Sequence, residues 1–131
     1  MNLLIDTHVL IWWARNSRRL GKGTRELIAS PRNSVWVSAA SIWEISIKAS
    51  LRRLDIDETL AATITENLDR HGFSALPIQF VHAVAVRNLP FHHSDPFDRM
   101  LIAQAQCEGL TLVTADPAFA AYDIRTIDGS L

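Results

Sequence analysis

Short apolar segments alternate with longer helical segments along this chain of 131 residues. We predict strands over five of these segments, at residues 3–5, 34–37, 75–78, 110–113 and 124–127. The first is wholly apolar (Leu-Leu-Ile), as is typical of a strand buried on both faces of a parallel sheet. Helices between successive strands then form right-handed crossovers. The pattern predicts an α/β fold with a mostly parallel sheet.

The intervening segments are predicted as helices from their capping and stop signals, over residues 9–14, 24–30, 38–53, 57–71, 79–88 and 95–108. Thr24 and Ser38 are expected to cap the second and third, the third running to about Arg53. Pro77 cannot donate a ladder hydrogen bond, so it favours an edge position for the third strand. Residues 129–131 are expected to fray.

The length and composition indicate one globular domain over residues 1–131, with 48% hydrophobic and 21% charged residues. No apolar run approaches the ~20 residues that span a bilayer. The apolar run 3–13 contains Asp6 and His8 and follows no basic region, so it does not indicate a signal peptide. The single cysteine, Cys107, excludes an internal disulfide, fits a reducing cytoplasm and is expected to pack inside. We therefore expect a cytoplasmic protein that has no membrane segment.

The net charge of −1 does not indicate a nucleic-acid partner for the molecule as a whole. The basic residues nevertheless gather in two groups, one at residues 15–25 and one at residues 48–53. A solvated face explains either group, and a local phosphate-binding surface is the alternative.

The stretch 94–105 carries an acid that points inward. Asp95 is a good N-cap, Pro96 suits the first helical position, and Asp98 falls in the first turn, where the helix dipole favours an anion. The neighbours of Asp98 at helical spacing are all apolar, namely Leu101, Ile102 and Ala105. Asp98 is therefore predicted to be a carboxylate at the head of a buried helix.

Three further acids share this end of the predicted sheet. Asp6 directly follows the first strand, Asp116 lies just beyond the fourth, and Glu44 lies two turns into the helix after the second. In open α/β sheets, ligands bind outside the carboxyl ends of the strands, where the strand order reverses. Converging carboxylates repel one another unless a cation neutralises them, and Mg²⁺ and Mn²⁺ prefer hard oxygen ligands. One cysteine and two adjacent histidines (residues 92–93) do not indicate a zinc site.

Each acid also has a purely structural explanation. Asp95 and Asp116 precede prolines as helix N-caps would, and Glu44 could pair with Lys48 on an exposed helix face. Asp98 could simply complement the helix dipole. Asp6, by contrast, has no capping role of comparable clarity. Because all four acids are expected at the same end of the sheet, we favour a functional site over four separate structural roles.

Four stretches carry a family resemblance: LLIDTHVLIWW (3–13), VSAASIWEISIK (37–48), DPFDRMLIAQA (95–105) and LVTADPAF (112–119). In this order they resemble the PIN-domain family, in particular the VapC-like toxin ribonucleases of bacterial toxin–antitoxin pairs. The resemblance implies a Rossmann-like, three-layer α/β/α fold with about five parallel strands. It also implies a metal-dependent endoribonuclease that hydrolyses RNA phosphodiester bonds through a metal-activated water.

The resemblance also implies roles for single residues. The acidic quartet is matched by Asp6, Glu44, Asp98 and Asp116. Mg²⁺ or Mn²⁺ would be held by Asp6, Asp98 and Asp116, while Glu44 would orient a water or a second ion. Supporting positions beside the acids are matched by Thr7, Ser38, Ser41, Thr114 and Asp95, the last as a cap or a further ligand. Arg99, expected to be exposed beside the site, and Arg15 and Arg19 are the predicted RNA contacts.

The implied partners are RNA, a cognate VapB-like antitoxin and a second copy of the chain, because VapC-like proteins usually form homodimers. Trp12 or Trp13 could face such a partner. Three alternatives remain open at this point. They are a PIN nuclease of RNA processing without an antitoxin, a non-catalytic regulatory α/β module that binds Mg²⁺, and a structural protein that dimerises through its aromatic face.

Overall fold

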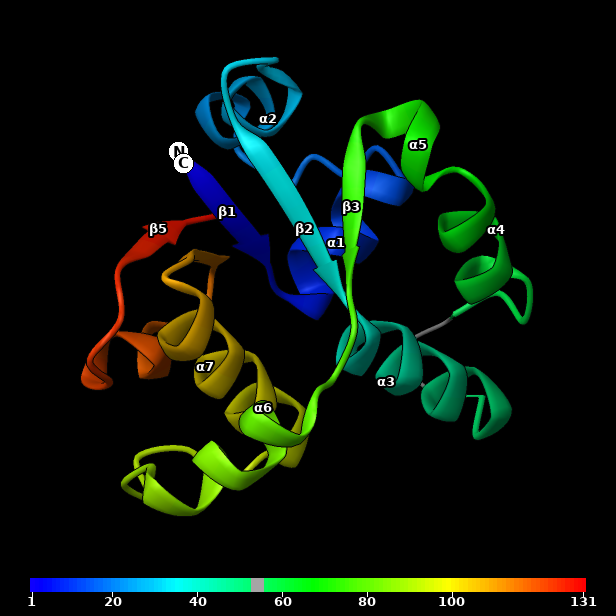
Figure 1. Ribbon diagram of the computed structural model, residues 1–131. Helices are drawn as coiled ribbons and strands as arrows, with labels where there is room; N and C mark the ends of the chain where they lie inside the picture. The colour runs from blue at the N-terminus through cyan, green and yellow to red at the C-terminus, as the bar shows by residue number, and fades with distance from the viewer. Residues whose placement is uncertain (53–55) are drawn as a thin grey trace.

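The computed structural model describes residues 1–52 and 56–131, and its centre is a five-stranded parallel sheet (Figure 1). The strands are β1 (Asn2–Ile5), β2 (Ser34–Ser38), β3 (Phe73–Leu76), β4 (Thr111–Thr114) and β5 (Thr126–Asp128). Their order across the sheet is β3-β2-β1-β4-β5, and every pairing is parallel. The predicted parallel sheet is confirmed. The third strand lies at an edge as expected, but it spans residues 73–76 and not 75–78, so Pro77 follows the strand and does not belong to it.

The helices follow the predicted alternation. They are α1 (Thr7–Ala14), α2 (Lys22–Ala29), α3 (Ala39–Ser50), α4 (Leu60–Glu66), α5 (Leu68–His71), α6 (Phe80–Ala85) and α7 (Pro96–Glu108), with the 3₁₀ helices η1 (Val86–Asn88) and η2 (Pro117–Ala121). The helix after Ser38 ends at Ser50, and Arg53, its expected end, lies outside the described residues.

The single helix expected over residues 57–71 is divided into α4 and α5 at Asn67. The Nδ2 atom of Asn67 donates to the carbonyl of Thr63 at 2.7 Å, the carbonyl that the Asn67 N–H would bond in a continuous helix. The Asn67 N–H bonds the carbonyl of Ile64 instead. A side chain that competes with the backbone in this way interrupts the helix.

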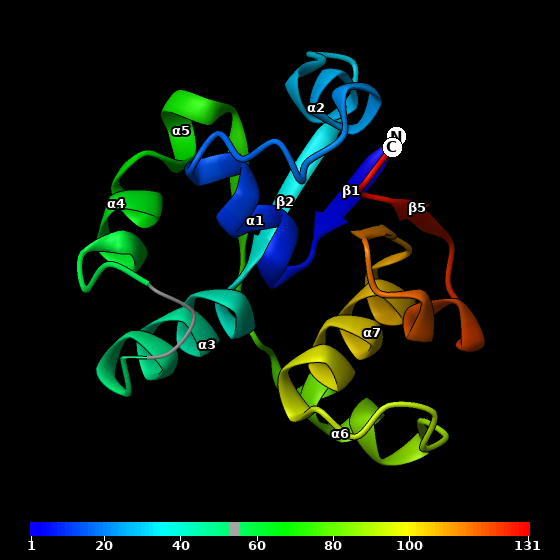
Figure 2. The same cartoon turned by 180° about the vertical axis from the view of Figure 1, so that it is seen from behind.

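Two apolar clusters cover the two faces of the sheet, which confirms the three-layer architecture (Figures 1 and 2). Leu3 and Ile5 pack into the cluster with α1, α2 and α4, whereas Leu4 packs into the cluster with α7 and η2. All three side chains are fully buried, as expected for a strand covered on both faces.

The C-terminal residues are ordered, so the expectation that residues 129–131 fray is wrong. The Leu131 carbonyl accepts a hydrogen bond from the Thr24 N–H at 3.2 Å, and the Thr24 hydroxyl donates to the Asp128 carbonyl at 3.0 Å. Thr24 thus lies inside α2 and does not cap it; Gly21 is the N-cap. A Cβ atom on Gly21 would lie 2.0 Å from a Leu131 backbone carbon, which explains the glycine. The two ends of the chain also lie together in both views (Figures 1 and 2).

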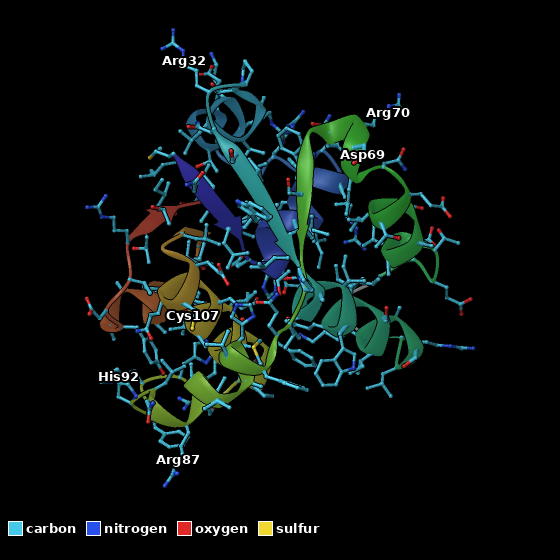
Figure 3. All side chains as sticks on the ribbon, viewed as in Figure 1. Arg32, Asp69, Arg70, Arg87, His92 and Cys107 are labelled. Carbon is cyan, nitrogen blue, oxygen red and sulfur yellow. The ribbon has the colours of Figure 1, made fainter. Side chains whose placement is uncertain are left out.

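Two surface features complete the fold. Cys107 lies on α7 and is exposed, so the expectation that it packs inside is wrong (Figure 3). Across the described parts of the chain, no helix has the length and apolar character needed to cross a membrane.

The strand order reverses between β1 and β4, which pair in register through Ile5 and Val113. Asp6 follows β1, and Asp116 follows β4 by two residues. Since α7 leads back along the sheet into β4, its first turn lies at the same carboxyl edge as these two acids. The topology therefore brings the three elements that carry the predicted metal ligands to one place.

Candidate functional site

Asp6 is buried at the end of β1, with 4% of its surface exposed. Its Oδ1 atom accepts a hydrogen bond from the Val9 N–H at 2.8 Å, so Asp6 is the N-cap of α1. The expectation that Asp6 has no clear capping role is wrong. Burial raises the pKa of Asp6, and hydrogen bonds from the Thr114 side chain and the Val9 N–H oppose that rise. The Asp6 carboxylate thus caps α1 and also contacts the side chain at the end of β4, which fixes its position at the carboxyl edge of the sheet.

Asp98 lies in the first turn of α7, and its N–H donates to Oδ1 of Asp95 at 3.0 Å, which confirms Asp95 as the N-cap. The pKa of Asp98 is raised to about 7. Burial is the largest cause, and the negative charges of Asp95, Glu44 and Asp6 add to it, whereas His93 lowers the pKa. Asp98 therefore lies in the field of three other carboxylates.

Glu44 is buried in α3, with 3% of its surface exposed. Its Oε2 atom pairs with Nζ of Lys48, one turn along the helix. The i,i+4 pair foreseen as the structural explanation thus exists, but the Glu44 carboxylate is not on an exposed face. Its Oε1 atom has no hydrogen-bond partner among the residues that the structure describes. A buried oxygen without a partner is costly, so it points to a missing ligand.

Asp116 is the most exposed of the four acids, with 43% of its side chain accessible. Its Oδ1 atom accepts the Ala118 N–H at 2.9 Å as the N-cap of η2. Its own N–H donates to the Thr114 hydroxyl at 3.0 Å. These bonds fix the carboxylate at the mouth of the site.

His93 was not among the predicted site residues, yet it lies between two of them. Its Nε2 atom is 3.0 Å from Oδ2 of Asp98 and 3.1 Å from Oδ2 of Asp116. One ligand atom from each of these three residues lies within 4.8 Å of the others. From the sequence, His93 entered only the argument against a zinc site, as the neighbour of His92. Its position two residues before the Asp95 cap was the signal that could have found it.

Asp6, Asp98 and Asp116 line one pocket of about 230 Å³, which we call the acidic pocket. Its other lining residues are His8, Trp12, Ala115 and Phe119. Glu44 is not among the lining residues and affects Asp98 through its charge. The structure therefore brings the three predicted metal ligands together, and the fourth acid lies outside the lining but close enough for its charge to raise the pKa of Asp98.

The predicted supporting hydroxyls hold together the elements that carry the acids. Thr7 in α1 donates to the Ser41 hydroxyl in α3 at 3.1 Å. Ser38 accepts the Ala40 N–H as the cap of α3 and donates to Oε1 of Gln104 in α7. The side chain of Thr114 at the end of β4 hydrogen-bonds Asp6, the N-cap of α1, so these bonds connect α1, α3, α7 and β4.

Arg99 is buried, with 5% of its surface exposed, so the expectation that it is exposed beside the site is wrong. Its guanidinium donates to four backbone carbonyls of the segment 86–93, those of Val86, Leu89, Pro90 and His93, at 2.9 to 3.3 Å. Backbone carbonyls outside regular structure need partners, and a guanidinium offers five donors. Arg99 thus fastens this segment to α7.

Arg15 and Arg19 are exposed. They belong to the connection between α1 and α2, whose path Figure 2 shows. Asp6 caps the other end of α1. The acidic pocket is lined on α1 by His8 and Trp12 and by neither of these arginines.

The residues of the pocket fit a hard divalent cation. Asp6, Asp98 and Asp116 offer carboxylate oxygens, and burial together with the acidic neighbours raises the pKa of Asp98. Outside the lining, the Oε1 atom of Glu44 is buried without a hydrogen-bond partner among the described residues. A divalent cation would neutralise these charges and reverse that rise.

Comparison with known proteins gives the family. The PIN domain family matches residues 3–125. Ribonuclease VapC22 of Mycobacterium tuberculosis is 28% identical over 114 residues, which cover 87% of this chain and 86% of VapC22. Ribonuclease VapC16 of the same organism is 37% identical over 59 residues, which cover 45% of this chain and only 42% of VapC16.

Among solved structures, VapBC2 from Rickettsia felis bound to a promoter DNA fragment contains a chain with the same fold. The TM-score is 0.73 at 15% identity, and the match covers 98% of both chains. The fold, the carboxyl-edge acids and a family match over nearly the whole sequence agree with the resemblance found in the four motifs. The chain belongs to the PIN-domain family.

Proposed function

We propose that this protein is a VapC-like endoribonuclease that hydrolyses RNA phosphodiester bonds with the help of a divalent metal ion. The observation that carries the proposal is the convergence of Asp6, Asp98 and Asp116 on one pocket at the carboxyl edge of β1 and β4. Two relatives with ribonuclease in their names, VapC16 and VapC22, support the same reaction class.

Mg²⁺ or Mn²⁺ is the proposed cofactor, since both prefer oxygen ligands. Asp6, Asp98 and Asp116 would hold the ion, directly or through water. When bound, it would lower the pKa of a water molecule and neutralise charge that develops on the phosphate. Glu44 offers its unpaired Oε1 atom and would orient a water or a second ion.

The chain's own residues prepare the pocket before any ligand arrives. The helix starts of α1 and η2 fix one oxygen each of Asp6 and Asp116, and Asp95 fixes the first turn of α7 that carries Asp98. Because backbone donors hold the Asp6 and Asp116 carboxylates and the Asp95 cap holds the turn that carries Asp98, little reorganisation is needed when substrate binds.

We also propose a VapB-like antitoxin as partner and a homodimer as the assembly. The structural neighbour from Rickettsia felis is a VapBC complex, which supports the first of these. A pocket with excess negative charge is complementary to a basic side chain, which is a physical reason for inhibition by a partner that carries one.

The test is cleavage of total cellular RNA by the purified protein in Mg²⁺, Mn²⁺ or EDTA, beside Asp6→Asn and Asp98→Asn variants. Asp69→Asn is the matched control, because Asp69 lies exposed on α5 (Figure 3). We expect metal-dependent cuts at a few sites that persist in the control and are lost in both site variants.

Absence of cleavage by folded wild-type protein free of antitoxin would contradict the proposal and favour a non-catalytic module. Cleavage at the wild-type level by both site variants would mean that the site is wrongly assigned.

A further inference from the structure

We propose that His93 is a positioning residue that holds Asp98 and Asp116 together through its Nε2–H group and does not itself bind the metal. The proposal rests on the proposed function, because it concerns the same carboxylates. It assigns a role to a side chain that lies in the centre of the acidic cluster.

The backbone decides which ring nitrogen of His93 carries the proton. The Asp95 N–H points at Nδ1 at 3.2 Å, so Nδ1 must accept that hydrogen bond. In a neutral imidazole the other nitrogen then carries the proton. Nε2 is therefore a donor, and its two neighbours at 3.0 and 3.1 Å are carboxylate oxygens of Asp98 and Asp116.

A nitrogen that carries a proton cannot also bind a metal ion. Metal binding at Nε2 would move the proton to Nδ1, where it would face the Asp95 N–H, and two donors would oppose each other. The arrangement therefore keeps His93 out of the ligand set, although its nitrogen lies within reach of a common ion. The remaining ligands are oxygens, which favour Mg²⁺ and Mn²⁺ over softer metals.

His93 is itself held on three sides. Its N–H donates to the Tyr122 hydroxyl at 2.8 Å, its carbonyl accepts from Arg99 at 3.3 Å, and its ring packs edge-on against Phe119 at 5.6 Å. Arg99 belongs to α7, the helix of Asp98, and Phe119 belongs to η2, the helix that Asp116 caps. The buried Arg99 therefore helps to hold His93 in position.

His93 lies between two groups of like charge, the carboxylates of Asp98 and Asp116. Without a donor between them, the Asp98 and Asp116 carboxylates would repel each other and separate. The Nε2–H group hydrogen-bonds Oδ2 of Asp116 and lies 3.0 Å from Oδ2 of Asp98, and each carboxylate keeps further lone pairs for an ion. Groups that orient metal ligands in this way typically contribute about 10- to 100-fold to metal affinity.

The experiment measures Mn²⁺ affinity by electron paramagnetic resonance for the wild type and for His93→Ala, His93→Gln and His92→Ala. We expect His93→Ala to weaken Mn²⁺ binding about tenfold or more. His93→Gln should restore most of the affinity, because its amide N–H₂ group replaces the Nε2–H donor. His92→Ala should not change it, because His92 is exposed, points outward and contacts the Tyr122 ring (Figure 3).

Spin-echo spectra of the Mn²⁺-loaded wild type, which need no variant, should show no directly bound nitrogen. A bound nitrogen, or unchanged affinity in folded His93→Ala, would overturn this inference and leave the proposed nuclease intact. A wild-type protein that binds no Mn²⁺ would overturn both. If His93→Ala does not fold, the wild-type spectrum and the Gln variant decide.

Discussion

Two pockets lie near the first turn of α7, and they differ in size and in chemistry. The acidic pocket is the smaller, at about 230 Å³. The other, which we call the apolar pocket, is about 370 Å³ and is lined mainly by apolar side chains, among them Ala40, Trp43, Phe91, Phe97 and Met100. Consecutive residues, Phe97 and Asp98, line different pockets. One helical turn thus contributes to both.

The comparison shows that volume does not locate the chemistry. The apolar pocket has a single charged lining residue among those described, Arg99, whose guanidinium is bound to backbone carbonyls. It offers apolar contact area, with the Trp43 and Phe97 rings edge-on at 5.1 Å. The acidic pocket contains two carboxyl groups with raised pKa values, Asp6 and Asp98, and strongly shifted pKa values cluster at functional sites.

The largest expected effect is on the rate of RNA cleavage, and it distinguishes two neighbouring residues that line different pockets. Asp98→Asn should lower the rate of RNA cleavage by a factor on the order of 10³, because a metal ion contributes several kcal/mol to the reaction. Phe97→Ala should retain activity within about threefold. Single-turnover cleavage of one mapped RNA site measures both, and equal losses would contradict the division between the pockets.

A second, smaller effect concerns stability and uses two residues of α3. Lys48→Met leaves the Glu44 carboxylate buried without its partner, and we expect a loss of about 1–3 kcal/mol in the free energy of unfolding. Trp43→Ala should cost less than about 1 kcal/mol, because Trp43 is 58% exposed. Urea titrations in EDTA compare the two, and saturating Mn²⁺ should recover part of the Lys48→Met loss.

The third effect is a pH dependence of stability, which we expect from the acidic pocket and not from the apolar pocket. The pKa of Asp98 is about 7 in the folded protein and near 3.8 when unfolded, so the folded state retains a proton between these values that the unfolded state has lost. The free energy of unfolding of the metal-free protein should therefore fall as the pH rises from about 4 to about 7. The raised pKa of Asp6 acts in the same direction.

Asp98→Asn should flatten this pH dependence, whereas Phe97→Ala should leave it unchanged. Thermal unfolding in EDTA at several pH values measures the slope. An identical slope in the wild type and Asp98→Asn would mean that Asp98 does not titrate in this range.

The smallest effect concerns the exposed arginines at the far end of α1. Because neither arginine lines the acidic pocket, Arg15→Ala and Arg19→Ala should change cleavage at a mapped site by less than about threefold. Filter binding of RNA to the metal-free protein measures their contribution to affinity. A loss of more than tenfold in RNA affinity would support the prediction that these arginines contact RNA.

Much of this arrangement could be predicted because its causes are local. The Asp95 cap, Pro96 and the first-turn position of Asp98 all follow from residues within four positions of one another. The sheet topology follows from the alternation of apolar strands and helices, and it places Asp6 and Asp116 at one edge without further information.

The parts that escaped prediction depend on distant contacts. His93 reaches Asp116 across 23 positions, through a loop whose path is set by Arg99 and Tyr122. Arg99 itself was expected in solvent because the carbonyls that bury it have no signature in the sequence. Thr24 and the C-terminal residues were misplaced for a similar reason, since Leu131 meets α2 only after the chain ends come together.

The most direct test of the central claim is anomalous diffraction from crystals that contain Mn²⁺. We expect an anomalous peak in the acidic pocket, within about 2.5 Å of carboxylate oxygens of Asp98 and at least one of Asp6 and Asp116. A peak located elsewhere, or no peak at millimolar Mn²⁺ near pH 8, would contradict the assignment of this pocket as the metal site of a nuclease.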